Sequence, residues 1–236
     1  MDLSKQLWRA AGAALCGLMF AGQAAAGICI EANVSFVGRG PLPVTVQSMQ
    51  NEASAIWQRY GVRIQWSTIP RDVHCPRVHG SFEVFIKYQL PAVGNGSASV
   101  VLGSTQLAPA AIHHAGICVD YDETQHLLES LSASRLIPLV GHPDIGPADI
   151  GRALGRVLAH EIGHVLLGAA RHQPGGLMRP SFNPEDLAAR QRWSYTLSKK
   201  EVERLGERER QLREYTEPGS LPSPGGSGVC HQAISR

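Results

Sequence analysis

The chain has 236 residues, of which 43% are hydrophobic and 18% are charged, and its formal net charge is +2 at pH 7. This composition is that of a globular protein, and the length fits one domain with a sizeable core. The near-neutral charge gives no basis for predicting a nucleic-acid partner or binding to an anionic membrane surface.

The first 26 residues have the pattern of a secretory signal. Lys5 and Arg9 precede an apolar run from Ala10 to Gly22, and small residues follow up to Ala26. The apolar run is too short for a comfortable membrane span, and no later segment is long and apolar enough to be one. We therefore expect a signal peptide over 1–26 that is cleaved after Ala26, and a mature protein that is secreted or periplasmic.

Four cysteines remain after the predicted cleavage: Cys29, Cys75, Cys118 and Cys230. An even number in an exported chain favours two disulfide bonds, with three possible pairings. A thiolate metal site is disfavoured because the chain has no Cys-x-x-Cys pair. A bridge from Cys29 to Cys230 would hold the C-terminal tail, but all three pairings stay open.

Hydrophobic periodicity predicts several strands and helices in the first part of the mature chain. Alternating residues predict strands at 28–36, 62–66, 82–88 and 117–121, and a short apolar run follows Val100. Helical spacing predicts a helix over 46–60 that ends at Gly61. Asp120 and Asp122 follow the 117–119 run, and turn capping is a better explanation of them than a structural calcium site.

Two helices are expected in the second part, followed by a tail. The first starts near Pro147 with Asp149 in its first turn. Ser198 and Glu201 form a capping box that starts the second, which is highly charged up to Arg213. The segment 217–228 is rich in Pro, Gly and Ser, so we predict a folded domain over 27–215 and a flexible tail over 216–236.

The first of these two helices carries the run His160-Glu161-Ile162-Gly163-His164. Residues four apart lie on one face of a helix, so His160 and His164 can direct two imidazoles at one metal ion. Glu161 lies beside that ion, where it can hold a water molecule and accept its proton. This is the H-E-x-x-H pattern of zinc peptidases.

The residues after this run extend the similarity. Gly168 suits a helix end in the left-handed conformation, which would let the chain reverse and bring His172 to the same ion. Met178 follows a turn of Pro174, Gly175 and Gly176. This resembles the metzincins, whose helix is followed by a glycine, a third histidine and a methionine-containing turn under the metal, and the ending at Met178 is most similar to the matrixin branch.

The spacing departs from the family pattern H-E-x-x-H-x-x-G-x-x-H. Gly168 comes one residue late and His172 two residues late. A longer helix and a longer turn would still deliver His172 as the third ligand. The alternatives are a downstream glutamate such as Glu185, or no third ligand from the protein.

The resemblance implies one α/β (α+β) domain with a twisted mixed sheet, an active-site helix and C-terminal helices. It implies Zn²⁺ as the cofactor, His160, His164 and His172 as its ligands, and Glu161 as the general base of a zinc metalloendopeptidase that acts on proteins or peptides. An edge strand would border the cleft in such a fold, so His113 and His114 are weaker candidates for substrate contact. We expect a monomer.

Two other functions stay open at this stage. The same site would suit a zinc hydrolase or amidase with a non-protein substrate. The fold would also suit a non-catalytic binding protein, although the intact Glu161 argues against it because a purely structural zinc site needs no base.

Overall fold

The structure, a computed structural model, describes residues 27–38, 40–67, 78–88, 101–106, 115–134, 145–168 and 171–215. The predicted signal peptide and C-terminal tail lie outside these ranges, as do Cys75, Cys230, His113 and His114. The predictions made for those residues stay predictions.

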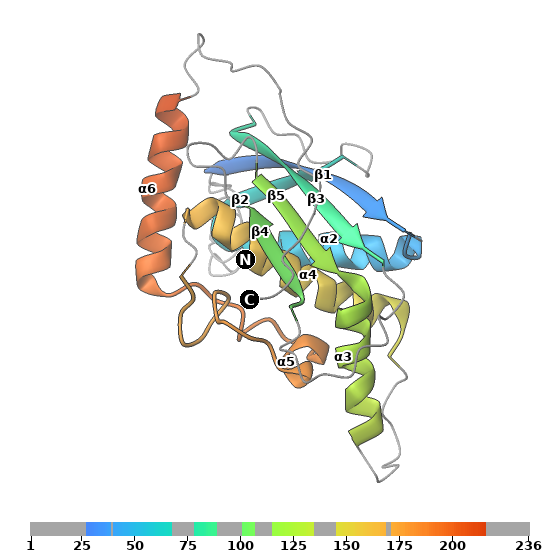
Figure 1. Cartoon of the computed structure of the whole chain (residues 1–236). Helices are drawn as coiled ribbons and strands as arrows, with labels where there is room; N and C mark the ends of the chain where they lie inside the picture. The colour runs from blue at the N-terminus through green and yellow to red at the C-terminus, as the bar shows by residue number, and fades with distance from the viewer. Residues whose placement is uncertain are drawn as a thin grey trace, which may run out of the picture.

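The described residues form a mixed sheet of five strands at the centre of the fold (Figure 1). The strands are β1 (Ile28–Val37), β2 (Val62–Trp66), β3 (Gly80–Lys87), β4 (Gly103–Gln106) and β5 (Ala115–Asp120). Their order is β2-β1-β3-β5-β4. The pairings β1 to β2, β1 to β3 and β3 to β5 are parallel, whereas β4 pairs with β5 antiparallel and forms one edge of the sheet.

Helices α2 (Pro43–Gln58) and α4 (Pro147–Leu167) pack closely against each other beside the sheet (Figure 1). Two glycines of α4 permit this approach, because a Cβ on Gly151 would clash with the Thr45 carbonyl and one on Gly155 would lie 2.6 Å from the Met49 carbonyl oxygen. Trp57 of α2 is fully buried, and its indole Nε1 donates to the main-chain oxygen of Ala159 at 3.0 Å. The two helices therefore hold the part of α4 that carries the histidines in a fixed position.

The mixed sheet and the helix that carries the H-E-x-x-H run agree with the predicted fold class. The strands at 62–66 and 28–37 and the helix α2 match the periodicity well. Val101 and Leu102 of the apolar run precede the strand, because β4 begins at Gly103, and Val101 is 58% exposed. The strand predicted over 117–121 ends at Asp120, since Tyr121 begins a helix that the sequence reading omitted, α3 (Tyr121–Ser134).

Asp120 explains why the chain changes from strand to helix at this point. Its side-chain Oδ1 accepts a hydrogen bond from the backbone N–H of Glu123 at 3.1 Å, and the hydroxyl of Thr124 donates to its carbonyl at 2.7 Å. The first of these bonds satisfies a backbone N–H at the start of α3 that has no partner within the helix. The preference for capping over calcium binding is consistent with this role of Asp120.

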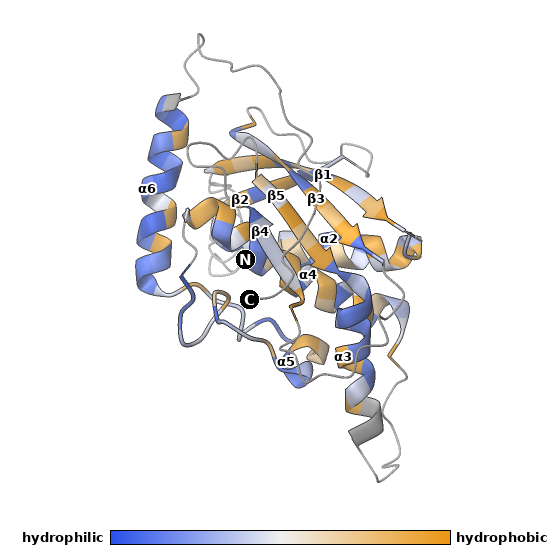
Figure 2. Cartoon of the chain, in the orientation of Figure 1, coloured by the Kyte–Doolittle hydropathy of each residue, from blue (hydrophilic) through white to orange (hydrophobic). Residues whose placement is uncertain are grey.

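The last two helices are α5 (Pro184–Ala188) and α6 (Lys199–Tyr215). The predicted capping box is present at the start of α6, because Ser198 N–H donates to Glu201 at 2.6 Å and Glu201 N–H donates to the Ser198 hydroxyl at 3.4 Å. Figure 2 shows that α6 is largely hydrophilic, while Leu205 and Leu212 are buried. Among the described residues, no helix combines the length and the apolar character that a membrane crossing requires.

Cys29 on β1 and Cys118 on β5 are buried, and each is disulfide-bonded. Strand β3 lies between β1 and β5, so these two cysteines are too far apart to bond to each other. Cys75 and Cys230 lie outside the described residues, so the choice between the other two pairings stays open.

Candidate metal centre

Helix α4 presents His160 and His164 on one face, one turn apart. Pro147 occupies its first turn, and the Asp149 carboxylate accepts a hydrogen bond from the Gly146 N–H at 3.1 Å, which stabilises the helix start. Both histidines are buried, since His160 is 5% exposed and His164 is 7% exposed. Their Nε2 atoms lie 3.0 Å apart and so converge on one point.

Gly168 ends the helix in the left-handed conformation, with φ at 58°. A residue with a Cβ adopts this conformation at a cost, which explains the glycine. After this reversal the His172 ring lies with its centroid 5.2 Å from that of His160 and 5.0 Å from that of His164. One nitrogen from each of the three histidines lies within 4.8 Å of the others. The longer helix and turn thus bring His172 to the pair despite the irregular spacing.

Hydrogen bonding and burial prepare His160 for a metal ion. Its Nδ1 lies 2.8 Å from the carbonyl oxygen of Leu177, so the Nδ1–H tautomer leaves Nε2 free to coordinate. Burial lowers the pKa of His160 to about 4, against the opposing effect of the Leu177 hydrogen bond. Partial desolvation also lowers the pKa of the exposed His172, and the nearby His164 adds to this. Neutral imidazoles are the form that binds metal.

The donor set fits Zn²⁺. Three imidazole nitrogens are a common catalytic zinc set, and two nitrogens bound at ~2.0–2.1 Å in a tetrahedral site lie roughly 3.3 Å apart. The observed 3.0 Å between the Nε2 atoms of His160 and His164 is close to that separation.

Met178 packs against the part of α4 that carries the two histidines. It is buried, and its sulfur packs so tightly on Gly163 that a Cβ at that position would clash with it. Gly163, between the two histidines of α4, therefore permits the close contact. Leu177, next to Met178, supplies the carbonyl that orients His160. The same turn therefore packs against α4 through Met178 and selects the tautomer of the His160 imidazole through Leu177.

Glu161 is also buried, with 5% of the residue exposed. Its Oε2 accepts a hydrogen bond of 2.5 Å from the hydroxyl of Thr105 on β4. Burial raises the pKa of the Glu161 carboxyl, while the Thr105 hydrogen bond and the proximity of His164 act in the opposite direction. The contact of Thr105 with Glu161 was not predicted from the sequence, because β4 is a four-residue polar strand with no hydrophobic periodicity.

Glu185, the alternative third ligand, lies elsewhere. It is exposed in the first turn of α5, and the group of metal-binding side chains found among the described residues consists of the three histidines. His126, on α3, is likewise exposed and separate from this group.

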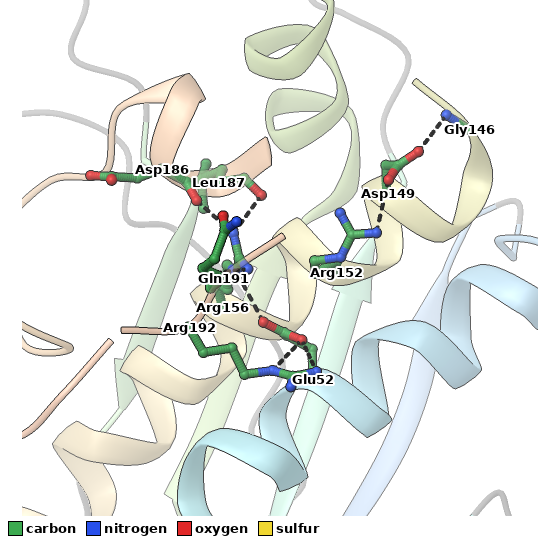
Figure 3. Close-up of polar contacts among 9 residues, drawn as sticks. All are labelled: Glu52, Gly146, Asp149, Arg152, Arg156, Asp186, Leu187, Gln191 and Arg192. Atoms are coloured by element: carbon green, nitrogen blue, oxygen red, sulfur yellow. Dashed lines mark hydrogen bonds and ion pairs between the residues drawn. The ribbon is translucent and has the colours of Figure 1, made fainter. Parts of the chain in front are cut away.

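Arg156, one turn before His160 on α4, ties the segment after the methionine turn to the helix (Figure 3). Its side chain is fully buried and donates to Glu52 Oε1 of α2 at 2.9 Å. It also donates to three main-chain oxygens, those of Asp186, Leu187 and Gln191. Arg192 closes the network through the second carboxylate oxygen of Glu52. This buried arginine could not be predicted from the sequence, because the residues around it have the pattern of any amphipathic helix.

We expect Arg156→Leu to lower the free energy of unfolding by about 3–5 kcal/mol, because it leaves a buried carboxylate with one partner fewer and three carbonyls without a donor. Denaturant titration of the variant and the wild type measures this. Arg152→Leu is the matched control on the same helix, since the Arg152–Asp149 pair is partly exposed and such pairs contribute about 0–1 kcal/mol. Equal losses in the two variants would contradict a stabilising role of the buried network.

Comparison with solved structures finds distant similarities, which include the two described here. No family model matches the chain, and no curated protein matches it. An archaemetzincin from Methanopyrus kandleri aligns with 16% identity over 77% of this chain and 96% of its own, with a TM-score of 0.42. A zinc-dependent peptidase from Methanocorpusculum labreanum aligns with 14% identity over 75% of this chain and 99% of its own, also with a TM-score of 0.42. Similarity this low does not establish a function, so the proposal below depends on the residues of this chain.

Proposed function

We propose that the chain is an exported zinc-dependent endopeptidase. The observation that supports this best is the group of His160, His164 and His172 around one point, with the buried carboxylate of Glu161 next to it in the helix. A purely structural site would have no use for an acidic residue at this position. Export is supported by the signal pattern in residues 1–26.

The three imidazoles would hold the metal and leave a position open for water. Bound Zn²⁺ supplies Lewis acidity, which polarises a carbonyl and lowers the pKa of a bound water toward ~7. Glu161 would accept the proton of the attacking water and then deliver it to the leaving amine nitrogen. His160 would keep its orientation through Leu177, and Met178 would support the helix between the two histidines.

The edge strand β4 is the proposed place for an extended substrate. It pairs with β5 on one side only and is the last strand of the described sheet. Thr105 of β4 contacts Glu161, so a peptide added along this edge would lie beside the base. Main-chain hydrogen bonds from a strand edge bind peptides with little dependence on sequence, which suits an endopeptidase.

We expect the purified mature protein to contain one zinc per chain and to cleave an unfolded protein such as reduced casein. Elemental analysis measures the metal, and gel analysis with and without a chelator measures the hydrolysis. A panel that also contains cell-wall fragments tests the alternative of a non-protein substrate. A protein that binds zinc and cleaves none of these would instead support a non-catalytic role, and the absence of zinc after loading would contradict both.

A further inference from the structure

We propose that Thr105 is a positioning residue for the proposed base, whose hydroxyl fixes the Glu161 carboxylate in the orientation that hydrolysis requires. This inference depends on the proposed function for the role of Glu161. It extends that function to a residue on the edge strand, outside the H-E-x-x-H run, the third histidine and the methionine turn.

The Thr105 hydroxyl lies close to two oxygen atoms of Glu161, one on the carboxylate and one on the main chain. The Thr105 hydroxyl oxygen lies 2.5 Å from Glu161 Oε2 and 3.2 Å from the main-chain oxygen of Glu161. A hydroxyl that donates to a carboxylate forms one of the stronger hydrogen bonds in proteins. The bond spans two elements that are distant in sequence, since β4 and α4 contribute one residue each.

Strand β4 is shaped to receive this carboxylate. Gly103 and Thr105 are two residues apart, so they share the face of the strand that points to α4. A Cβ built on Gly103 would lie 2.7 Å from Glu161 Oε1 and 2.9 Å from its Cγ. The side chain of Glu161 therefore fits against the bare backbone of Gly103 while Thr105 holds its other oxygen. The antiparallel register with β5, in which Thr105 pairs with Ile117, keeps both residues in place.

Positioning matters because a glutamate has three side-chain torsions and the base must lie within hydrogen-bond reach of the water. A misplacement of about 1 Å can cost a reaction roughly 100-fold. Within the described residues, Thr105 is the side chain that hydrogen-bonds the Glu161 carboxylate. Removing the hydroxyl should thus lower the turnover rate and leave zinc bound by the histidines.

The test compares Thr105→Val, Thr105→Ser and the control Ser81→Ala in the zinc-loaded protein. Valine keeps the shape of threonine but removes the donor, so kcat on a peptide substrate should fall roughly 10–100-fold while KM changes by less than about threefold. Serine keeps the hydroxyl and should restore most of kcat. Ser81 lies on the inner strand β3, outside the proposed substrate edge, and its variant should match the wild type. Zinc content should be one per chain in all of them.

A crystal structure of each zinc-free protein gives a second measure that needs no activity. The Glu161 carboxylate should keep its position in the wild type and in Thr105→Ser, and should leave it in Thr105→Val. A valine variant with wild-type kcat, an unmoved Glu161 or a loss of zinc would each overturn the positioning role. Failure of the proposed function would give a different result, because the zinc-loaded wild type would then hydrolyse no substrate. The crystal structures would still show whether Thr105 holds the Glu161 carboxylate in place.

Discussion

Glu161→Gln should lower kcat on a peptide substrate by at least ~10²–10⁴-fold, the usual contribution of a general base, and Glu161→Ala should lower it by more. The amide of glutamine is isosteric with the carboxylate but cannot accept the proton of the attacking water. Its oxygen can still accept the hydrogen bond from Thr105, so the fold around the site should remain intact. Zinc should stay at one per chain, because the three histidines supply the ligands in our proposal.

Steady-state kinetics with elemental analysis of the same samples separates base from ligand. Glu203→Gln is a suitable control, since Glu203 lies on α6 with 61% of its side chain exposed and forms a long ion pair with the exposed Lys199. A Glu161→Gln protein that keeps nearly full activity would contradict the proposed mechanism. Loss of zinc in this variant would instead indicate that Glu161 is required to hold the metal.

The features that the sequence predicted well are those encoded by local pattern. The helix start at Pro147, the left-handed Gly168 and the capping box at Ser198 all lie where the structure has them. Each depends on a few neighbouring residues, so the chain itself carries the information. The alternating strands β1, β2 and β3 were visible for the same reason, because one or both faces are buried along their length.

The features that it missed depend on contacts between distant parts of the chain. Strand β4 is short and polar, and it is held by pairing with β5 rather than by its own hydrophobicity. The Thr105 contact with Glu161 joins residues 56 positions apart, and the bond from Arg156 to Glu52 joins residues 104 apart. Asp120 and Glu123 form a capping pair that marks the start of helix α3. The apolar alternation that runs up to Tyr121 predicted a strand there instead.

His172 comes two residues later than the metzincin pattern places the third histidine, so its role as a ligand requires the tertiary structure to compensate for the spacing. His172→Ala should abolish turnover and weaken zinc binding by more than the roughly 10–100-fold that follows loss of a hydrogen-bond partner of a ligand. Because His172 is exposed, the substitution should have little effect on the free energy of unfolding of the metal-free protein. Competition with a chromophoric chelator measures the zinc affinity, and denaturant titration of the metal-free protein measures the stability.

Glu185→Ala is the matched variant, because Glu185 was the other candidate for the third ligand and is exposed in α5. We expect it to bind zinc and turn over substrate like the wild type. The opposite result, with zinc lost from Glu185→Ala and kept by His172→Ala, would require the segment 171–190 to rearrange around the metal. His160→Ala gives the scale for both, since it removes a ligand that lies within α4 and is oriented by the Leu177 carbonyl. His172, in contrast, is positioned by the chain reversal at Gly168 and by the turn that carries Met178. If His172→Ala loses as much zinc affinity as His160→Ala, this reversal holds the His172 imidazole as firmly as α4 holds that of His160.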